Sequence, residues 1–350
     1  MHVGNLSQRK LKRICLIFEA NHFNQLSMLN YPIKFTPILK EKIWGGKKLK
    51  EIFNKDASGD QIGESWEISG VKGDVSVVEN GPLQGKSLSQ LQQEYRGDLV
   101  GNRIYQQFGD EFPLLIKFID AKTELSVQLH PDDEIARQRH DSFGKTEMWY
   151  ILQADEGAEI NVGFKESISK EKYLEYLKAG KITELLNFEK VKKGDSFFIR
   201  TGKVHAIGAG VLLAEIQQTS DITYRIYDWD RVDAQGNSRE LHTELALDAI
   251  DFERKDDFRL TYNQEPNTSN QVASCEYFTT NYLSVAEDLK KDYSQLDSFV
   301  IFMGVSGKVT VQVGDHEESL TAGQTLLIPA AVKEVSLSGE KAELLEVYIS

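Results

Sequence analysis

Short runs of alternating hydrophobic and polar residues dominate the chain and predict β-strands. The clearest runs lie at residues 33–39, 65–78, 113–120, 125–130, 147–152, 196–200 and 211–218. A polar loop is expected between the runs at 125–130 and 147–152. Gly, Asp and Pro separate the runs, which is typical of an antiparallel sandwich or barrel. We therefore expect a mainly β fold.

Helical periodicity is confined to four segments. They lie at residues 87–95, 169–179, 182–186 and 241–251. Segment 169–179 repeats apolar side chains every three to four residues and ends at Gly180, as an amphipathic surface helix does. The last segment, 241–251, follows the first β region and is a natural domain boundary.

A second β region begins near Val272. Its expected strands lie at residues 298–304, 308–313, 324–328 and 344–348. The stretch GQTLLIPA in this region is similar to the earlier stretch GDSFFIRTG. Two related β units in tandem are the simplest explanation of this likeness.

Composition narrows the class of protein. The 350 residues carry 41 basic and 54 acidic side chains, a formal net charge of −13, which argues against a general nucleic-acid binder because such a protein needs a basic face. The two cysteines, Cys15 and Cys275, are too few for a disulfide framework and indicate a reducing, cytoplasmic compartment. No apolar run approaches the roughly 20 residues that span a bilayer, so no membrane association is expected.

The first 27 residues differ from the rest of the chain. Four basic side chains stand here against Glu19 alone, and the apolar run that follows them is too short for a signal peptide. Met28 comes just before the first clear strand pattern. We expect residues 1–27 to be a disordered extension or a translation-start artefact, with Met28 as the true start. The mass of the native N-terminus tests this expectation.

Gln128 and His130 are the first candidates for chemistry. They are two residues apart on a predicted strand, so their side chains share one face of it. Strand geometry thus directs an amide oxygen and an imidazole at one point. A surface-facing polar pair is the ordinary alternative, and it is favoured for a single histidine.

Glu147 is the second candidate and lies in the stretch GKTEMWYIL. Strict alternation places Lys145 and Trp149 on the same face as Glu147 and the intervening side chains on the other. A carboxylate buried among bulky apolar groups needs a partner. That partner is either a metal ion or Lys145, and the segment alone does not decide between them.

His205 is the third candidate, after the strand SFFIR and a Thr-Gly-Lys turn. Two histidines and a carboxylate from separate strands form a good zinc set, and the oxygen of Gln128 would add a weaker fourth ligand. His130, Glu147 and His205 equally match the two-histidine, one-carboxylate triad of non-haem iron oxygenases. Both metals therefore stay open at this point.

Three further polar residues could carry chemistry. Glu215 and Gln217 share a strand face, which makes them candidates for acid–base work, although a solvated sheet edge is the ordinary interpretation. Arg225 lies among aromatic residues in SDITYRIYDWDR. An arginine in such a setting stacks or pairs structurally, or it grips a phosphate with two parallel N–H groups.

Several stretches together resemble the short bacterial form of the type I mannose-6-phosphate isomerases. The matching stretches are YPIKFTPILKEKIWGG, IGESWEIS, PLLIKFIDA, LSVQLHPDD, GKTEMWYIL, HAIGAGVLLAEIQQTSDITYRIYDWDR and, more loosely, LLIPA. They occur in the family's order and run from about Tyr31 to the end of the chain. So many long motifs in one order make the resemblance specific.

The resemblance implies a fold of two cupin jelly rolls with a small helical insertion. It also implies an enzyme that interconverts mannose 6-phosphate and fructose 6-phosphate with one zinc ion in the first barrel. The family's zinc ligands fall on Gln128, His130, Glu147 and His205.

The resemblance further implies roles for residues around the metal. The family's catalytic positions fall on Arg225, Glu215 and Lys145, while Lys117 and Ser126 align with the phosphate end of its pocket. The reaction would move a proton between C1 and C2 of the open-chain sugar through a cis-enediol. Glu215, alone or with Lys145, would shuttle that proton, and Arg225 would hold the phosphate or neutralise the enediolate.

The same resemblance divides the chain. We expect a catalytic, zinc-binding cupin domain at residues 28–240, with its helical insertion at about 165–190. Residues 241–350 are expected to form a linker helix and a second cupin domain. Where a metal-binding cupin presents a histidine after the Ile-Pro turn, this chain has Val332, Lys333 and Glu334. The second domain is therefore expected to be metal-free.

Two alternatives stay open beside the isomerase. One is another cupin metalloenzyme, of the non-haem iron oxygenase type, and the other is a non-catalytic sugar-binding cupin. The expected partner is a small sugar phosphate, with no nucleic acid and no membrane, and the expected assembly is a monomer or a weak homo-oligomer. Fructose 6-phosphate formation, measured with and without a chelator, separates the three functions.

Overall fold

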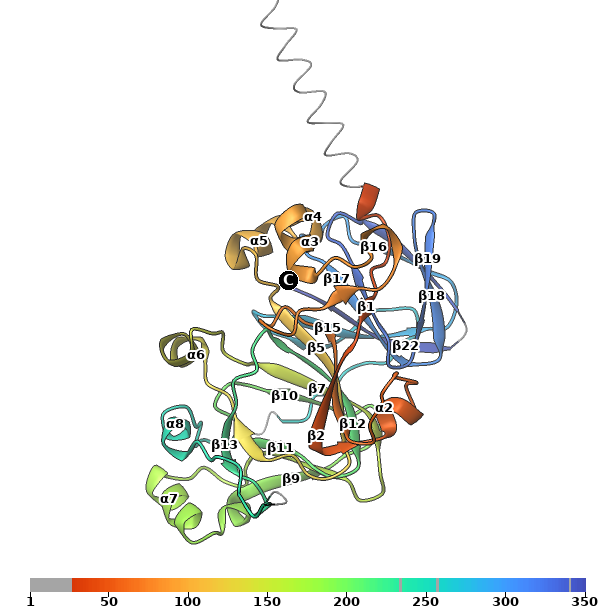
Figure 1. The fold of residues 1–350 in the computed structure, drawn as a ribbon. Coiled ribbons are helices and arrows are strands. Elements are labelled where there is room, and N and C mark those ends of the chain that lie inside the picture. Colours follow the sequence, from red (N-terminus) through yellow and green to blue (C-terminus); the bar gives the residue numbers. More distant parts are fainter. Residues whose placement is uncertain (1–26, 233–234, 256–257, 340) are drawn as a thin grey trace, which may run out of the picture.

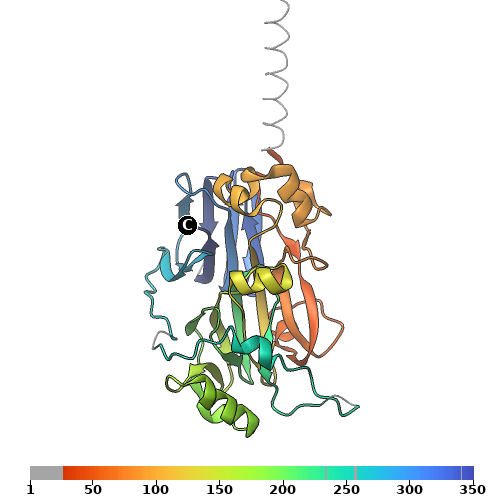
Figure 2. The same ribbon diagram turned by 90° about the vertical axis from the view of Figure 1, so that its left-hand side faces the viewer.

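Four antiparallel sheets form the bulk of the protein, and they pack as successive layers (Figure 1 and Figure 2). The computed structural model describes residues 27–232, 235–255, 258–339 and 341–350. A separate small sheet pairs β1 (Phe35–Thr36) with β4 (Val77–Val78). The mainly β fold expected from the alternating pattern is confirmed.

Two of the sheets enclose the first barrel. One sheet has six strands in the order β10 (Ser196–Ile199), β7 (Glu147–Ala154), β12 (Val211–Gln218), β5 (Leu114–Ala121), β2 (Ile38–Gly46) and β3 (Ile62–Ile68). The other has five strands in the order β13 (Tyr224–Tyr227), β6 (Val127–Leu129), β11 (His205–Ile207), β8 (Glu159–Phe164) and β9 (Leu186–Lys190). Large apolar side chains, among them Trp149 and Ile160, pack between the two sheets.

The other two sheets form the second barrel. One has five strands in the order β14 (Asn270–Ser274), β15 (Thr279–Val285), β22 (Ala342–Tyr348), β17 (Val300–Ser306) and β20 (Thr325–Ile328). The facing sheet has four strands in the order β16 (Leu289–Asp292), β21 (Glu334–Ser338), β18 (Lys308–Val313) and β19 (His316–Thr321). Phe302 and Val311 are among the apolar side chains between them. The two β units in tandem are thus confirmed.

The inner strands of the six-stranded sheet are buried on both faces, because the interior of the first barrel covers one face and the second barrel covers the other. Trp149 on β7 packs toward the first barrel, whereas Met148 and Tyr150 pack toward the second. The ring of Tyr150 stacks on that of Tyr282 from β15, with 6.4 Å between the ring centroids. Every residue of β5 and of β12 is buried. A near-continuous apolar run such as PLLIKFID suits a strand covered on both sides.

Helices lie at the ends and edges of this stack. They are α2 (Lys48–Glu51), α3 (Leu88–Tyr95), α4 (Gly97–Val100), α5 (Asn102–Phe108), α6 (Asp133–His140), α7 (Lys170–Lys178), α8 (Thr243–Leu247) and the 3₁₀ turns η1 (Gly81–Leu83) and η2 (Ile182–Leu185). The predictions of α3 and α7 are confirmed, and Ser87 caps α3 by accepting a hydrogen bond from the N–H of Gln90. The helix predicted at residues 182–186 is the 3₁₀ turn η2. The helix predicted at residues 241–251 is shorter in the structure, where α8 begins at Thr243 and ends at the C-cap Asp248.

One expectation from the hydrophobic pattern is wrong. The polar loop expected before residue 147 contains α6, and the Asp132 side chain caps this helix by accepting from the N–H of Ile135. The mostly extended run at residues 65–78 is interrupted where its glycines lie: β3 ends at Ile68, and a turn with Gly73 at a φ of 94° precedes β4. In both places a capping or turn residue decides the local structure.

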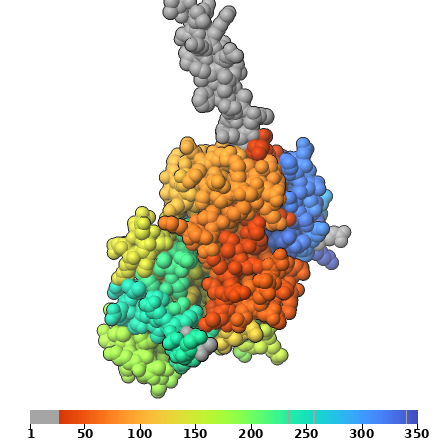
Figure 3. Space-filling view, viewed as in Figure 1, coloured from red at the N-terminus to blue at the C-terminus, as the bar shows by residue number. Residues whose placement is uncertain are grey.

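The N-terminal part of the described chain also packs on the second barrel (Figure 3). Ile33 forms a bridge with Leu327, and the N–H groups of Asn102 and Arg103 donate to the Asp297 carboxylate at 2.8 and 2.9 Å. A glycine is required at position 101, because a Cβ there would lie 2.3 Å from the carbonyl oxygen of Asp297. The two barrels therefore share a packed interface, and the boundary at residue 240 stays a prediction.

Two further expectations concern the N-terminal extension and membrane-spanning helices. The extension expected at residues 1–27 lies, except for Ser27, outside the described residues. Within the described ranges, no helix is long and apolar enough to cross a lipid bilayer.

Candidate metal centre and substrate cavity

A cavity of about 260 Å³ lies between the two sheets of the first barrel. Three tryptophans, Trp44, Trp66 and Trp149, contribute to its wall. The charged side chains of its lining are Lys42, Glu64, Lys117, Lys145, Glu215, Asp221, Arg225 and Arg239. A small ligand with charges and hydroxyl groups fits such a lining.

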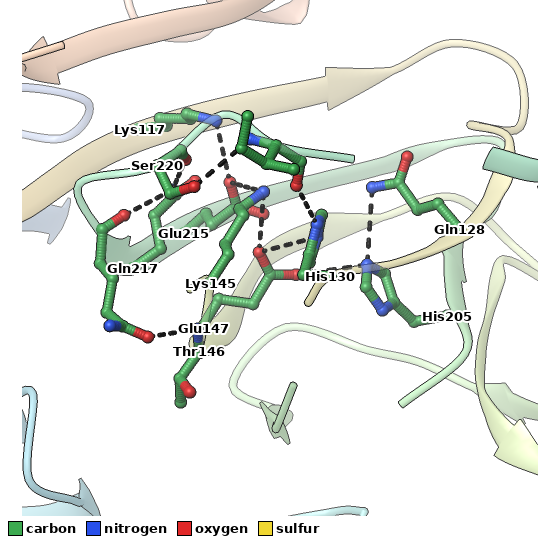
Figure 4. A network of polar contacts seen from close by, with 12 residues as sticks. Lys117, Gln128, His130, Lys145, Thr146, Glu147, His205, Glu215, Gln217 and Ser220 are labelled. Atoms are coloured by element: carbon green, nitrogen blue, oxygen red, sulfur yellow. Dashed lines mark hydrogen bonds and ion pairs between the residues drawn. The ribbon is translucent and has the colours of Figure 1, made fainter. Parts of the chain in front are cut away.

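His130, Glu147 and His205 converge beside this cavity (Figure 4). His130 directly follows β6 and His205 begins β11, two neighbouring strands of the five-stranded sheet, whereas Glu147 begins β7 in the facing sheet. His205 Nε2 lies 3.5 Å from Glu147 Oε1, and His130 Nε2 lies 3.6 Å from Glu147 Oε2. The packing of the two sheets thus brings ligand atoms from distant segments within 4.8 Å of one another.

The spacing and chemistry of these atoms fit one divalent cation. Tetrahedral bonds of about 2.0–2.1 Å to nitrogen and oxygen place neighbouring ligand atoms about 3.3 Å apart, close to the two distances just given. All three side chains are buried, and His130 Nε2 and Glu147 Oε1 form no hydrogen bond. Buried polar atoms without hydrogen bonds cost free energy, so a bound cation is their natural partner.

Backbone carbonyl groups hold both imidazoles in the tautomer that binds a metal. Nδ1 of His130 donates to the carbonyl oxygen of Ile222 at 2.7 Å, and Nδ1 of His205 donates to that of Lys203 at 2.8 Å. Each Nε2 therefore keeps its lone pair for a ligand. Burial lowers the pKa of His205 to about 4 and the pKa of His130 well below its ordinary value. Both rings are neutral at neutral pH, as metal ligands must be.

Gln128 lies next to His205 across the sheet. The two residues are register partners on β6 and β11, and the amide nitrogen of Gln128 lies 3.5 Å from His205 Nε2. The amide oxygen lies 3.4 Å from the hydroxyl of Ser126. A half-turn of the amide exchanges its oxygen and nitrogen with little change of shape. That half-turn directs the oxygen at the three-residue cluster, where a fourth ligand is expected.

Lys145 also pairs with Glu147, with 3.0 Å between Nζ and Oε2. Of the two partners considered for Glu147, Lys145 is in contact with it. The two histidines that could bind a metal ion together with Glu147 also lie beside it. Burial raises the pKa of Glu147 to about 7, and the nearby Glu215 adds to the rise. Burial opposes the charge on Lys145, but Glu147 and Glu215 outweigh it and raise the pKa of the lysine. Lys145 is therefore charged at neutral pH.

Glu215 lies in the charged wall of the cavity (Figure 4). Its Oε1 lies 3.2 Å from Lys117 Nζ and 3.8 Å from Lys145 Nζ, and Trp149 Nε1 donates to its Oε2 at 2.9 Å. The interpretation of a solvated sheet edge is wrong, because β12 lies inside the six-stranded sheet and Glu215 is 3% exposed. Burial alone would raise the pKa of Glu215, but the two lysines lower it to about 2. Glu215 is thus ionised at neutral pH.

Arg225, Ser126 and Lys117 line the same cavity. Arg225 Nε donates to Ser126 Oγ at 3.2 Å, and its Nη1 donates to the carbonyl oxygen of Glu240 at 2.9 Å. Arg225 on β13 is the register partner of Gln128 on β6, so its backbone lies one strand from a predicted metal ligand. The nine residues to which the resemblance gives a role gather in or beside one cavity. Gln217, the other acid–base candidate, is outside the cavity lining, and its amide nitrogen donates to the carbonyl oxygens of Gln218 and Ser220.

Other residues of the cavity were not singled out from the sequence. Glu64 and Trp66 share one face of β3, and Trp66 Nε1 donates to Glu64 at 2.6 Å. Their spacing in GESWEIS is the same strand-face signal that indicated Gln128 and His130. Arg239 lies in the polar stretch GNSREL, where no periodic pattern distinguishes it.

The fold and the cluster define the class of protein: a two-barrel cupin with a candidate metal centre in its first barrel. Comparison with protein-family models agrees with this class. Residues 33–164 match the model of phosphomannose isomerase type I, catalytic domain. Residues 267–349 match the model of mannose-6-phosphate isomerase, cupin domain.

Individual relatives narrow the class. The chain is 36% identical over 310 residues to the mannose-6-phosphate isomerase of Streptococcus mutans, which covers 88% of this chain and 96% of that relative. It is also 36% identical over 317 residues to the mannose-6-phosphate isomerase ManA of Bacillus subtilis. That alignment covers 89% of this chain and 97% of ManA. A crystal structure of the mannose 6-phosphate isomerase from Bacillus subtilis matches with a TM-score of 0.82 at 33% identity, over 91% of this chain and 99% of that one. The chain belongs to the type I phosphomannose isomerase family.

Proposed function

We propose that this protein interconverts mannose 6-phosphate and fructose 6-phosphate, with one zinc ion as cofactor. The observation that carries the proposal is the buried cluster of His130, Glu147 and His205 beside a charged cavity, in a chain of the type I phosphomannose isomerase family. Membership of this family favours the isomerase over an iron oxygenase and over a non-catalytic sugar-binding cupin.

The proposed zinc ligands, Gln128 and the three cluster residues, are the nitrogen and oxygen donors that catalytic zinc takes. When bound, zinc supplies Lewis-acid polarisation of the carbonyl and hydroxyl oxygens of the sugar. The charges of Lys117 and Lys145 balance those of Glu147 and Glu215, so a divalent cation makes this part of the cavity positive. A sugar phosphate, whose phosphate carries about −1.5 to −2 charges at pH 7, complements that balance.

The reaction transfers a proton between C1 and C2 of the open-chain sugar through a cis-enediol. Of the two residues predicted to shuttle the proton, only Glu215 is in the accepting form, because Lys145 stays protonated. We assign the removal and return of the proton to Glu215. Its low pKa makes it a weak base, so the cavity must stabilise the enediolate as it forms. Lys145, whose Nζ lies 3.8 Å from Glu215, would donate to the developing negative oxygen.

We assign Arg225 to the phosphate end of the substrate. A guanidinium offers two parallel N–H groups that match phosphate oxygens. The Ser126 hydroxyl, 3.2 Å from Arg225 Nε, adds a further polar group there. Lys117 projects from β5 in the facing sheet and would approach the substrate from the opposite wall, with its Nζ 3.2 Å from Glu215.

Three finer expectations remain predictions. Elemental analysis decides whether the metal is zinc, and cell fractionation tests the cytoplasmic compartment inferred from the cysteine content. Size-exclusion chromatography with light scattering tests the expected monomer or weak homo-oligomer.

A coupled assay for fructose 6-phosphate formation tests the proposed function. The purified protein should convert mannose 6-phosphate, lose this activity after treatment with a strong chelator, and regain it with Zn²⁺. Full turnover by the metal-free protein would contradict the metal-dependent mechanism. A metal-loaded protein that makes no fructose 6-phosphate would contradict the function, and bound iron with oxygen consumption would favour the oxygenase.

A further inference from the structure

Asp228 anchors two arginines, and one of them, Arg239, lines the substrate cavity beside Arg225. Its Oδ2 accepts from Arg239 Nε at 2.7 Å, and its Oδ1 accepts from Nη2 of Arg239 and Nη2 of Arg231. Asp228 is 5% exposed. Burial alone would raise the pKa of this carboxyl, but the hydrogen bonds from the two guanidinium groups lower it. A charged, buried carboxylate therefore fixes the orientation of both arginines.

Arg239 lines the same cavity as Arg225. Asp228 occupies the edge of the Arg239 guanidinium formed by Nε and Nη2, which leaves the opposite edge, with Nη1, for a ligand. The two guanidinium groups are close enough that, after burial, the Arg239 charge is the next largest cause of a lowered pKa of Arg225. In the described part of the chain, the guanidinium of Arg225 donates only to neutral oxygens, those of Ser126 and of the Glu240 backbone.

Three guanidinium groups gather at this end of the cavity, and one carboxylate is hydrogen-bonded to them. Arg231 and Arg239 both donate to Asp228, whereas Glu240 acts on Arg225 only through space and Asp221 is a further carboxylate of the lining. Like charges held as close as those of Arg225 and Arg239 disfavour one another unless an anion lies between them. A phosphate monoester, with about −1.5 to −2 charges at pH 7, is such an anion.

We propose that Arg239 is a phosphate-binding residue, that Asp228 is its positioning residue, and that Arg225 and Arg239 together select the dianionic form of the substrate phosphate. This inference rests on the proposed function and deepens it, because only Arg225 and Ser126 are otherwise assigned to this end of the cavity. Arg225 and Arg239 contact the phosphate oxygens. Asp228 contacts no substrate and acts by holding Arg239.

The substitution Arg239→Gln tests the binding role. Loss of a charged hydrogen-bonding group is expected to raise KM for mannose 6-phosphate about 10- to 100-fold, with kcat nearly unchanged because the contact is made before and during the reaction. The matched control is Arg259→Gln, since Arg259 is also paired with carboxylates, those of Asp195 and Glu189, but lies outside the cavity lining. An unaltered KM in a folded Arg239→Gln protein would overturn the inference.

The pH dependence of KM separates phosphate recognition from a structural role. The second phosphate proton has a pKa of about 6, so KM of the wild type should rise as the pH falls through that value and the dianion is lost. This rise should be flatter in Arg239→Gln and unchanged in Arg259→Gln. A pH profile of Arg239→Gln parallel to that of the wild type would refute selection of the dianion.

The substitution Asp228→Asn tests the positioning role. It removes the charge that orients Arg239 but leaves both arginines in place, so KM should rise less than in Arg239→Gln while kcat is retained. In the double variant, the effect of Asp228→Asn on KM should disappear, because Arg239 is no longer there to be oriented. Fully additive effects on KM would refute action through Arg239.

Binding of inorganic phosphate gives a readout that does not depend on turnover. The tryptophans of the cavity wall serve as the fluorescent reporter, and Arg239→Gln should weaken phosphate binding while Arg259→Gln should not. If the wild type bound phosphate in this way but did not isomerise mannose 6-phosphate, the proposed function would fall and the phosphate site would stand. If Arg239→Gln bound phosphate as tightly as the wild type, this inference would fall and the isomerase would stand.

Discussion

Each barrel buries a glutamate between its two sheets, but the two carboxylates differ in how fully their oxygens are satisfied. In the second barrel, Glu346 on β22 accepts hydrogen bonds at 2.6 Å from Tyr293 and Ser269 and at 2.9 Å from Asn281. Lys291 Nζ adds an ion pair at 2.9 Å. In the first barrel, Glu147 has one close partner, Lys145, whose Nζ lies 3.0 Å from Oε2, and its Oε1 accepts no hydrogen bond.

This difference separates a structural polar cluster from a functional one. A buried carboxylate with a partner for every lone pair stabilises one arrangement of the chain, and it leaves no room for a ligand. A buried carboxylate with an unsatisfied oxygen beside two neutral histidines costs free energy until a cation binds. Among the described residues, only the first barrel contains such a group of metal-ligand type. The metal-free state expected for the second barrel stays a prediction.

The largest expected effect comes from removing a metal ligand. His130→Ala should lower kcat/KM for mannose 6-phosphate at least about 10³-fold, because polarisation by the metal is worth several kcal/mol. The control is His316→Ala, since His316 is an exposed histidine of the second barrel. Near wild-type turnover by His130→Ala in the coupled assay would show that the cluster of His130, Glu147 and His205 is not the active site.

The proton-transfer assignment should give the next largest effect. Glu215→Gln should lower kcat about 10²- to 10⁴-fold, as expected for loss of a general base. The same change in the other barrel, Glu346→Gln, should leave kcat unchanged because Glu346 lies far from the reacting sugar in the fold. Equal kcat values for the two variants would remove the functional distinction between the barrels.

The effects on stability should be the reverse of the effects on activity, with the larger loss in the second barrel. Glu346→Ala removes the carboxylate that Lys291, Tyr293, Ser269 and Asn281 share, so the free energy of unfolding should fall by about 3–5 kcal/mol, as when one partner of a buried pair is removed. Activity per folded molecule should be retained. Denaturant titration measures the loss, and a change within experimental error would mean that the closed network does not stabilise the second barrel.

Glu147→Gln in the metal-free protein sharpens the contrast. Burial raises the pKa of Glu147, so its charged form is held at a cost that a neutral amide does not carry. Lys145 keeps Glu215 as a partner at 3.8 Å, so the free energy of unfolding should change by less than about 1 kcal/mol, while turnover is lost. A destabilisation as large as that of Glu346→Ala would show that Glu147 stabilises the metal-free fold as strongly as Glu346 does, and would contradict the difference drawn between the two glutamates.

The smallest expected effect is a pH dependence of stability. Burial opposes the charge of Glu346, but Lys291 and the hydrogen-bond donors lower its pKa below the ordinary value of 4.5. A carboxyl whose pKa is lower in the folded than in the unfolded state adds stability above the unfolded pKa and loses it as the pH falls through the folded pKa. The stability gap between wild type and Glu346→Gln should therefore shrink as the pH falls below the ordinary pKa of 4.5. A constant gap would assign the stabilisation to packing alone.

Much of the fold could be predicted because its strands carry strong local signals. Alternation correctly separates Glu147 and Trp149 from Met148 and Tyr150, and the continuous run of β5 reflects burial on two faces. The missed helix α6 has a short capping signal at Asp132, which a reading of hydrophobic pattern overlooks.

The candidate site was less predictable where it depends on neighbours across the sheets. Spacing indicates that Gln128 and His130 share a face, but only the packing of two sheets brings Glu147 to the histidines. Glu215 could be taken for an edge residue because the neighbours of β12 are distant in sequence. Arg239 has no local signal at all, since Asp228 fixes it through a tertiary contact.

Elemental analysis of the purified wild type, Glu147→Gln and Glu346→Gln proteins tests the central claim most directly. The account predicts one zinc ion per chain in the wild type and in Glu346→Gln, and almost none in Glu147→Gln. A wild-type protein without a bound transition metal, or equal metal content in all three proteins, would contradict it.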